Sequence, residues 1–171
     1  MKRQLSIPVG VVVERTAVES IWQSHAWRPA GLIIGETALE TGSVLRQNGA
    51  STSFFAGSTT LELHPSDAES YRNNLSQDVP RLYVVLAAPE EMSGSAPAVH
   101  LVTAAPDEAE SYVADGDGGI VDGIPMEKAM IDLVTAYVTA HTTPPREEKR
   151  RFRVQPDPAD NTRMEYHRGR E

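Results

Sequence analysis

The sequence predicts an α+β fold, in which a mainly antiparallel sheet of about six or seven strands carries two short helices and one long C-terminal amphipathic helix. Short runs rich in β-branched residues, separated by glycine, proline and asparagine, indicate the strands. Apolar side chains at helical spacing between residues 126 and 138 indicate the long helix. A charged C-terminal stretch without an apolar period predicts disorder. We therefore expect one domain over residues 1–145 and a disordered charged tail over residues 146–171.

A β-hairpin is predicted at the start of the sheet. Residues 7–14 are rich in valine and isoleucine, and Gly10 within this run predicts a bulge or a close backbone approach. Residues 22–34 predict the returning strand. Arg28 and Pro29 interrupt it, because proline cannot donate a hydrogen bond to a neighbouring strand.

Three short strands are predicted next. Residues 43–47 lead into the dipeptide Asn48-Gly49, which favours a two-residue hairpin turn. Residues 51–56 and 59–64 follow, and the dipeptide Gly57-Ser58 between them predicts a second turn. This pattern is typical of a meander.

Two short helices are predicted on either side of a pair of strands. Residues 66–69 read Ser-Asp-Ala-Glu, a capping-box pattern, so we expect a helix there whose Tyr71 faces the sheet. Residues 81–88 are almost entirely apolar and predict a central strand, with residues 99–104 as its antiparallel partner. Pro106 then opens the second helix, because proline suits the first helical position.

The third helix is predicted to begin at Pro125 and to end before the two prolines at residues 144 and 145. One of its faces is apolar and must pack on the sheet or on a partner. That face consists of Met126, Ala129, Met130, Leu133, Val134, Tyr137 and Val138.

The composition excludes several classes of function. The chain has no cysteine, which excludes disulfides, cysteine nucleophiles and thiolate metal ligands and fits a reducing cytoplasm. The net charge is −8, and residues 1–145 hold 18 acidic but only eight basic side chains, against six and eight in residues 146–171. Nucleic-acid binding by the acidic body is therefore not expected. No apolar run is long enough for a signal peptide or a membrane span, so we expect a cytoplasmic protein.

Trp22, His25 and Trp27 form the candidate ligand pocket. They lie within six residues and include both tryptophans of the chain. One interpretation is an aromatic pocket in which a binding module or an enzyme holds a small planar ligand such as a pterin or a nucleotide. The preferred interpretation is that they form the inner side of the hairpin, covered by the helix of residues 125–141, because tryptophans supply large buried areas in any domain. The decisive feature is whether these rings open onto a cavity.

No catalytic or metal-binding arrangement is expected. The five histidines lack the close spacing of zinc sites, although His64 and His100 fall on the polar faces of their predicted strands. Aspartates between residues 115 and 122 resemble a calcium loop, but the twelfth position holds Met126 rather than glutamate. Neither a serine nucleophile elbow nor a glycine-rich phosphate loop occurs. We therefore expect a non-catalytic protein without a cofactor or a metal ion.

The basic start of the tail is a candidate partner-binding segment. Its charge suits an acidic protein partner or phosphate groups, although a tail that is merely solvated has the same composition. The residues concerned are Arg146, Lys149, Arg150, Arg151, Phe152 and Arg153.

Several stretches along the chain carry a family resemblance. They are Ile-Pro-Val-Gly-Val-Val-Val-Glu-Arg at residues 7–15, residues 22–27 with both tryptophans, Leu-Glu-Leu-His at 61–64, Tyr-Arg-Asn-Asn-Leu at 71–75, Pro-Arg-Leu-Tyr-Val-Val-Leu at 80–86, and residues 101–104, 108–109 and 125–141. In this order they resemble a family of proteobacterial proteins known only as a domain of unknown function. The basic stretch after residue 141 also looks similar.

That resemblance implies a genomic neighbourhood. Members of the family are often encoded beside molybdenum-dependent formate dehydrogenases and are sometimes labelled molybdopterin-guanine dinucleotide biosynthesis protein A. A nucleotidyltransferase of that name would carry a glycine-rich loop with lysine or arginine after its first strand, whereas Gly10 is followed here by Val-Val-Val-Glu. The resemblance implies this neighbourhood and no activity. Together with the absence of a catalytic arrangement and the basic segment of the tail, it leads us to expect an accessory protein, with such a dehydrogenase or its maturation factors as partner.

Overall fold

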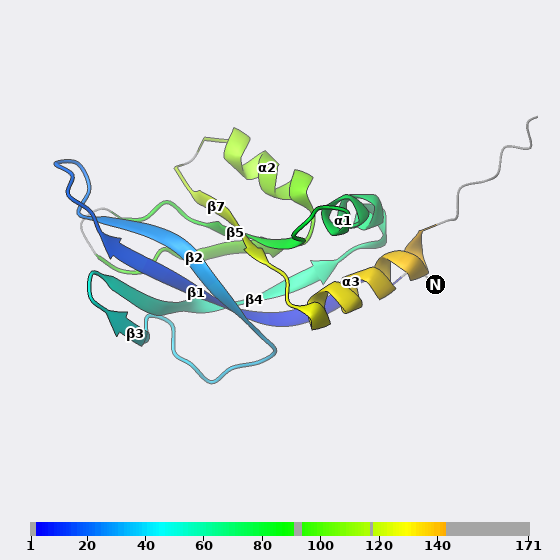
Figure 1. Ribbon diagram of the computed structural model, residues 1–171, viewed down its shortest axis with the longest axis horizontal. Helices are drawn as coiled ribbons and strands as arrows, with labels where there is room; N and C mark the ends of the chain where they lie inside the picture. The colour runs from blue at the N-terminus through cyan, green and yellow to red at the C-terminus, as the bar shows by residue number, and fades with distance from the viewer. Residues whose placement is uncertain (1–2, 91–93, 117, 143–171) are drawn as a thin grey trace, which may run out of the picture.

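The computed structural model describes residues 3–90, 94–116 and 118–142, and within them it confirms the α+β fold (Figure 1). The predicted tail, residues 146–171, lies outside the described residues. The strands are β1 (Leu5–Ala17), β2 (His25–Ile34), β3 (Val44–Asn48), β4 (Ser51–Leu63), β5 (Arg81–Leu86), β6 (Val99–Thr103) and β7 (Ile120–Pro125). The helices are the 3-10 turn η1 (Pro65–Asp67), α1 (Ala68–Leu75), α2 (Pro106–Ala114) and α3 (Lys128–His141).

The strands are antiparallel and are divided between two sheets. The first has the order β2-β1-β4-β3, and the second has the order β6-β5-β7. β4 packs against β6, and β2 packs against β7, so the sheets enclose one core between them. The predicted central strand, residues 81–88, is indeed β5, and the predicted partner, residues 99–104, is β6. The fully buried aliphatic side chains of this core include Val9, Val11, Val13, Leu61, Leu63 and Val84.

Gly57 lies inside a continuous strand, so the predicted turn at Gly57-Ser58 is wrong. β4 runs without a break from Ser51 to Leu63, and the residue pairing with β1 shifts by one between Val11 and Val12, opposite Gly57. The φ angle of Gly57 is 139°, which side-chain-bearing residues rarely adopt. A glycine within a strand often marks a bulge, and here the bulge lets β4 curve along β1.

The hairpin between β3 and β4 is confirmed, with its turn shifted by one residue. Asn48 pairs with Ser51, so the two turn residues are Gly49 and Ala50 rather than Asn48 and Gly49. Gly49 has a φ of 58°, as the first central residue of a type II′ turn requires.

The first helix forms where it was predicted, but without the capping box. The chain enters α1 through the 3-10 turn η1, and the N-cap residue Asp67 makes no side-chain capping bond. Ser66 Oγ donates instead to Asp67 Oδ1 at 3.4 Å. The predicted buried face is confirmed by Ala68 and Tyr71, which are both buried.

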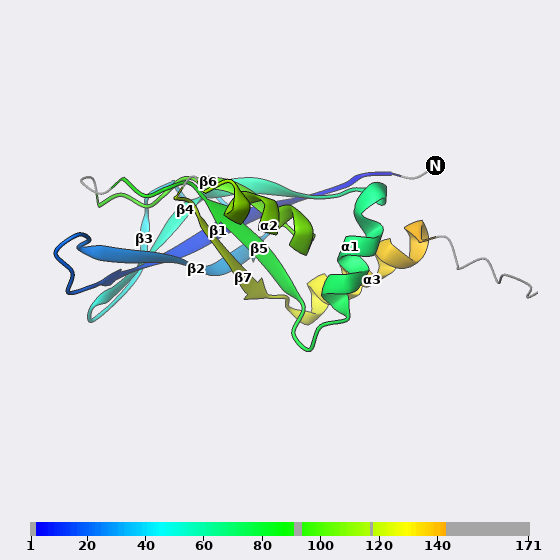
Figure 2. The same ribbon diagram turned by 90° about the horizontal axis from the view of Figure 1, so that it is seen from above.

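The third helix starts later than predicted, because Pro125 ends a strand. β7 pairs with β5 over Ile120–Pro125, and α3 begins at Lys128. Gly123 leaves room for the Arg81 side chain on the neighbouring strand, since a Cβ at Gly123 would lie 2.9 Å from Cδ of Arg81. The predicted apolar face is confirmed for Met130, Val134, Tyr137 and Val138, which are buried, whereas Ala129 is exposed. Figure 2 shows α3 lying beside α1, and the two helices are in contact.

Two buried tyrosines join these helices to the end of β4. The rings of Tyr71 and Tyr137 meet edge to face, with centroids 6.3 Å apart. The single O–H of Tyr137 lies 2.8 Å from the carbonyl oxygen of Arg3 and 2.9 Å from that of Leu63, so these two acceptors share its one hydrogen. The Tyr71 hydroxyl accepts from the backbone N–H of His64 at 2.9 Å. Burial raises the pKa of Tyr71 to about 12 and also raises the pKa of Tyr137.

We expect the fold to lose stability in alkali partly through Tyr71. The pKa of this phenol is raised from 10.0 in the unfolded chain to about 12 in the folded one, so the native state retains its proton longer. The contribution of Tyr71 to the free energy of unfolding is therefore constant below pH 10, and it is lost as the pH rises from 10 towards 12. Urea unfolding at pH 8 and at about pH 11 measures this loss. Tyr71→Phe should reduce the loss, whereas Tyr112→Phe should leave it unchanged. An equal loss in the wild type and in Tyr71→Phe would contradict the assignment.

Candidate functional site

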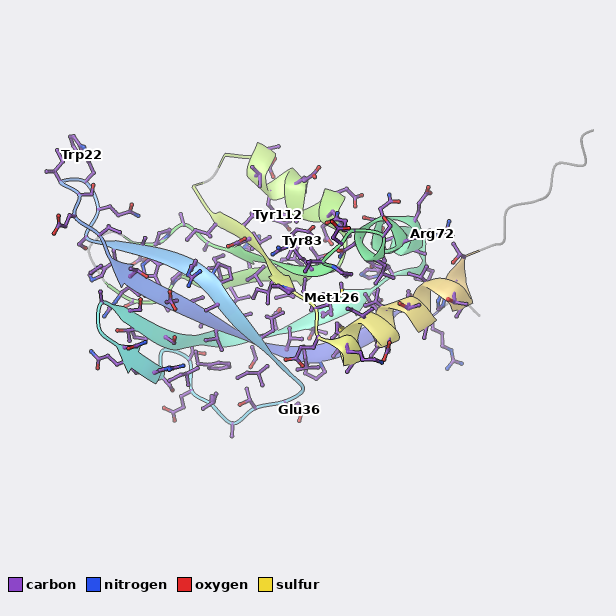
Figure 3. All side chains as sticks on the ribbon, in the orientation of Figure 1. Trp22, Glu36, Arg72, Tyr83, Tyr112 and Met126 are labelled. Carbon is purple, nitrogen blue, oxygen red and sulfur yellow. The ribbon has the colours of Figure 1, made fainter. Side chains whose placement is uncertain are left out.

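The loop between β1 and β2 carries two highly exposed apolar side chains. Ile21 is 89% exposed and Trp22 is 82% exposed. The loop is closed at its base by the bond from the Val18 N–H to the carbonyl of Ser24 at 3.1 Å, and the backbone N–H of Trp22 donates to Ser20 Oγ at 3.2 Å. Figure 3 shows Trp22 at the outer tip of this hairpin, at the far end of the molecule from α3. We call the pair Ile21 and Trp22 the apolar tip.

Trp22 therefore does not lie inside the hairpin, and the preferred packing interpretation is wrong for it. β2 begins at His25, so Trp22 belongs to the loop rather than to the strand. α3 does not cover this stretch either. Met130 and Leu133 of α3 lie beside Leu32 at the opposite end of β2. Ile21 and Trp22 belong to no repeating apolar pattern, and without one the sequence does not indicate whether a side chain is buried or exposed. Their exposure could therefore not be predicted.

Trp27 is the member of the set that does pack. Its ring is half-buried on β2 and meets the ring of Phe54, with centroids 5.6 Å apart. The guanidinium carbon of Arg15 lies 5.8 Å from the centroid of Trp27 and 4.9 Å from that of Phe54, within the range of cation–π contacts. Arg15 also donates from Nη1 to the carbonyl of Gly94 at 3.0 Å. This contact ties the hairpin to the connection between β5 and β6.

All three predicted pocket residues, Trp22, His25 and Trp27, nevertheless line one hollow, which we call the tryptophan hollow. Its volume is about 240 Å³, and Glu90 and Gly94 border it from the connection between β5 and β6. The imidazole of His25 contacts the preceding residue, since its Nδ1 lies 2.9 Å from Ser24 Oγ. The hollow offers indole surfaces, an imidazole and a carboxylate, a set that suits a small planar or cationic group. The sequence could not link Glu90 to this site, because only the tertiary fold brings it there.

His64 and His100 contact different neighbours. His64 Nε2 lies 3.2 Å from a carboxylate oxygen of Glu62, and the ring of His100 meets Tyr112 edge to face, with centroids 5.3 Å apart. Over the described ranges, no group of three or more histidine, aspartate or glutamate side chains could hold a metal ion. Asp122, from the segment that resembles a calcium loop, accepts the backbone N–H of Gly123.

The basic segment that was predicted to bind a partner, Arg146, Lys149, Arg150, Arg151, Phe152 and Arg153, lies outside the described residues. Within the part of the chain that the structure covers, no helix is both long and apolar enough to cross a membrane.

A family model matches residues 8–151, from β1 through the whole domain and ten residues past the end of α3. The chain belongs to the DUF3305 family, which is described as a family of proteins of unknown function. This match confirms the predicted membership in a domain family of unknown function. The matched region includes the apolar tip, the tryptophan hollow and the first residues of the basic segment. Neither the curated proteins nor the solved structures gave a match to this DUF3305 chain.

Proposed function

We propose that this DUF3305 protein is a non-catalytic cytoplasmic accessory protein that assists the assembly or maturation of a molybdenum-dependent formate dehydrogenase. In this role it binds another protein through the apolar tip. The observation that carries the proposal is the exposure of Ile21 and Trp22, 89% and 82%. Covering an exposed indole with a partner removes a large apolar surface from water, and tryptophan is enriched among the residues that dominate binding energy.

The class of partner rests on the family resemblance of the sequence. Proteins of the family that it resembles are often encoded beside molybdenum-dependent formate dehydrogenases. The basic segment from Arg146 to Arg153 is a second candidate contact with the same partner, because arginine side chains suit acidic protein surfaces.

A pull-down with tagged full-length protein from a molybdate-grown native host tests the proposal. The wild type should recover a dehydrogenase subunit or a cofactor-insertion factor. Trp22→Ala should weaken this binding about 30-fold, the effect of losing about 2 kcal/mol at a dominant contact residue. Val113→Ala is the matched control, because Val113 is also an exposed apolar residue, at 64%, but lies on α2. Recovery of neither kind of protein by the wild type would overturn the proposal.

A small-molecule function is the second candidate, because Trp22, His25 and Trp27 line one hollow of about 240 Å³. Both tryptophans of the chain border it, so intrinsic tryptophan fluorescence reports on this site alone. A thermal-shift screen with pterins and nucleotides distinguishes the two functions, since a ligand that binds only the folded state raises its Tm. No shift and unchanged fluorescence would eliminate this candidate.

A further inference from the structure

A second hollow, which we call the apolar groove, lies between β2, β7 and the first turns of α3. Its volume is about 400 Å³, which is within the range of occupied binding sites. It is separate from the tryptophan hollow, with which it shares no residue. Its apolar walls include Leu32, Ile34, Leu82, Ile124, Met130 and Leu133.

The rim of this groove carries one charge. Of the residues that the structure describes, Glu127 is the only charged one that lines the groove. It is exposed at the start of α3, where its side chain does not cap the helix. Among the described residues no cation pairs with Glu127, since the neighbouring Lys128 is paired with Asp132 at 2.8 Å. An occupant that matches these features has an apolar side chain flanked by positive charge.

We propose that the apolar groove binds the basic segment of the same chain, with the ring of Phe152 between the groove walls and a flanking arginine beside Glu127. Phe152 stands between Arg151 and Arg153, so the segment has the required order of charges and apolar surface. Methionines such as Met130 suit this role, because their flexible side chains adapt to an inserted ring.

The length of the chain permits this contact. α3 has 14 residues and is therefore about 20 Å long, and the groove lies at its N-terminal end. The ten residues from 143 to 152 can span about 33 Å when extended, so Phe152 can return along α3 as far as Ala129. The family match also continues ten residues past α3 to residue 151, so it includes the first residues of this segment and ends one residue before Phe152.

The absence of cysteine allows a direct test in the full chain. The double variant Ala129→Cys/Val154→Cys places one thiol on an exposed residue of the groove lining and one directly after the segment, and it leaves the Phe152 ring in place. A disulfide needs Cα atoms roughly 4.4–6.8 Å apart, so docking should make this intrachain bond form at least about ten times faster than random encounter allows. Val113→Cys/Val154→Cys gives the rate of random encounter, because Val113 lies on α2 outside the groove.

Each outcome of the oxidation decides the proposal. A faster intrachain disulfide for the groove pair supports it. Equal rates for both pairs overturn it, and so do disulfide-linked dimers joined through the groove pair, which would make a second copy the occupant.

If the cysteine variants fail to fold, Phe152→Ala should lower the Tm by about 3 °C, and Val154→Ala is its control. Equal Tm values for these two variants would then overturn it. The test uses purified protein without a dehydrogenase, so its result is independent of the proposed function.

Discussion

Asn74→Ala should destabilise the protein by about 3 to 5 kcal/mol, the largest effect that we expect from a single substitution. Asn74 is fully buried near the end of α1. Its Nδ2 donates to the carbonyl oxygens of Arg81 at 2.7 Å and Ala104 at 2.8 Å, and its Oδ1 accepts the backbone N–H of Arg81 at 3.0 Å. Alanine would leave these three backbone groups without their partner, and each buried unsatisfied group costs about 1 to 3 kcal/mol.

The bonds of Asn74 explain why its loss should affect the whole fold. Arg81 begins β5, the central strand of the second sheet, and Ala104 directly follows β6. One amide group therefore fixes α1 to two strands of that sheet. We expect the Tm to fall by roughly 10 °C, because about 1 kcal/mol corresponds to roughly 2–4 °C for a domain of this size.

Asn73→Ala is the matched control for this prediction. Asn73 is the preceding residue on the same helix, and its side chain is exposed. Asn74→Asp is the informative second variant, because it keeps the shape of the side chain while an ionised carboxylate cannot donate to either carbonyl. Urea unfolding of the three variants measures the differences. If Asn74→Ala came within about 1 kcal/mol of Asn73→Ala, the assignment of this role would be wrong.

Elements whose evidence is local could be predicted from the sequence. The apolar face of α3 repeats at helical spacing and is buried as expected, and the apolar run of β5 occupies the centre of its sheet. Gly10 within the valine run predicted a bulge or a close backbone approach, and the neighbour that approaches it is instead the side chain of Phe55. In each case a periodicity or a backbone requirement is contained within a few neighbouring residues.

Features that depend on distant partners could not be predicted. β7 contains Asp122 and Gly123, which favour a loop when considered alone, and only the pairing with β5 makes this segment a strand. In the sequence, Asn74 resembles an exposed polar residue at the end of a helix. Its partners at residues 81 and 104 are backbone groups, which no residue type in the sequence indicates. The candidate site combines both cases. Its aromatic residues are contiguous in the sequence and were found, whereas Glu90 joins them only through the fold.

Gly10→Val should destabilise the protein by about 3 kcal/mol, because the position has no room for a side chain. A Cβ at Gly10 would lie 2.7 Å from Cε2 and 3.3 Å from Cζ of Phe55, and 3.5 Å from Cβ of Ile33. The ring of Phe55 is only 1% exposed, so it cannot move aside without disturbing its surroundings. Valine adds two methyl groups to this contact, and the expected cost is that of overpacking a filled interior.

Gly31 provides the control, because it lies in the adjacent strand β2 and a Cβ there would come no closer than 3.9 Å to Val12. Gly31→Ala should leave the stability unchanged or raise it by up to about 0.5 kcal/mol, since alanine reduces the freedom of the unfolded chain. The decisive comparison is Gly10→Ala in the presence and absence of Phe55→Leu. If the ring causes the strain, the smaller leucine should relieve at least half of the cost of the alanine. Equal costs in both backgrounds would show that the backbone of β1, rather than Phe55, requires glycine at this position.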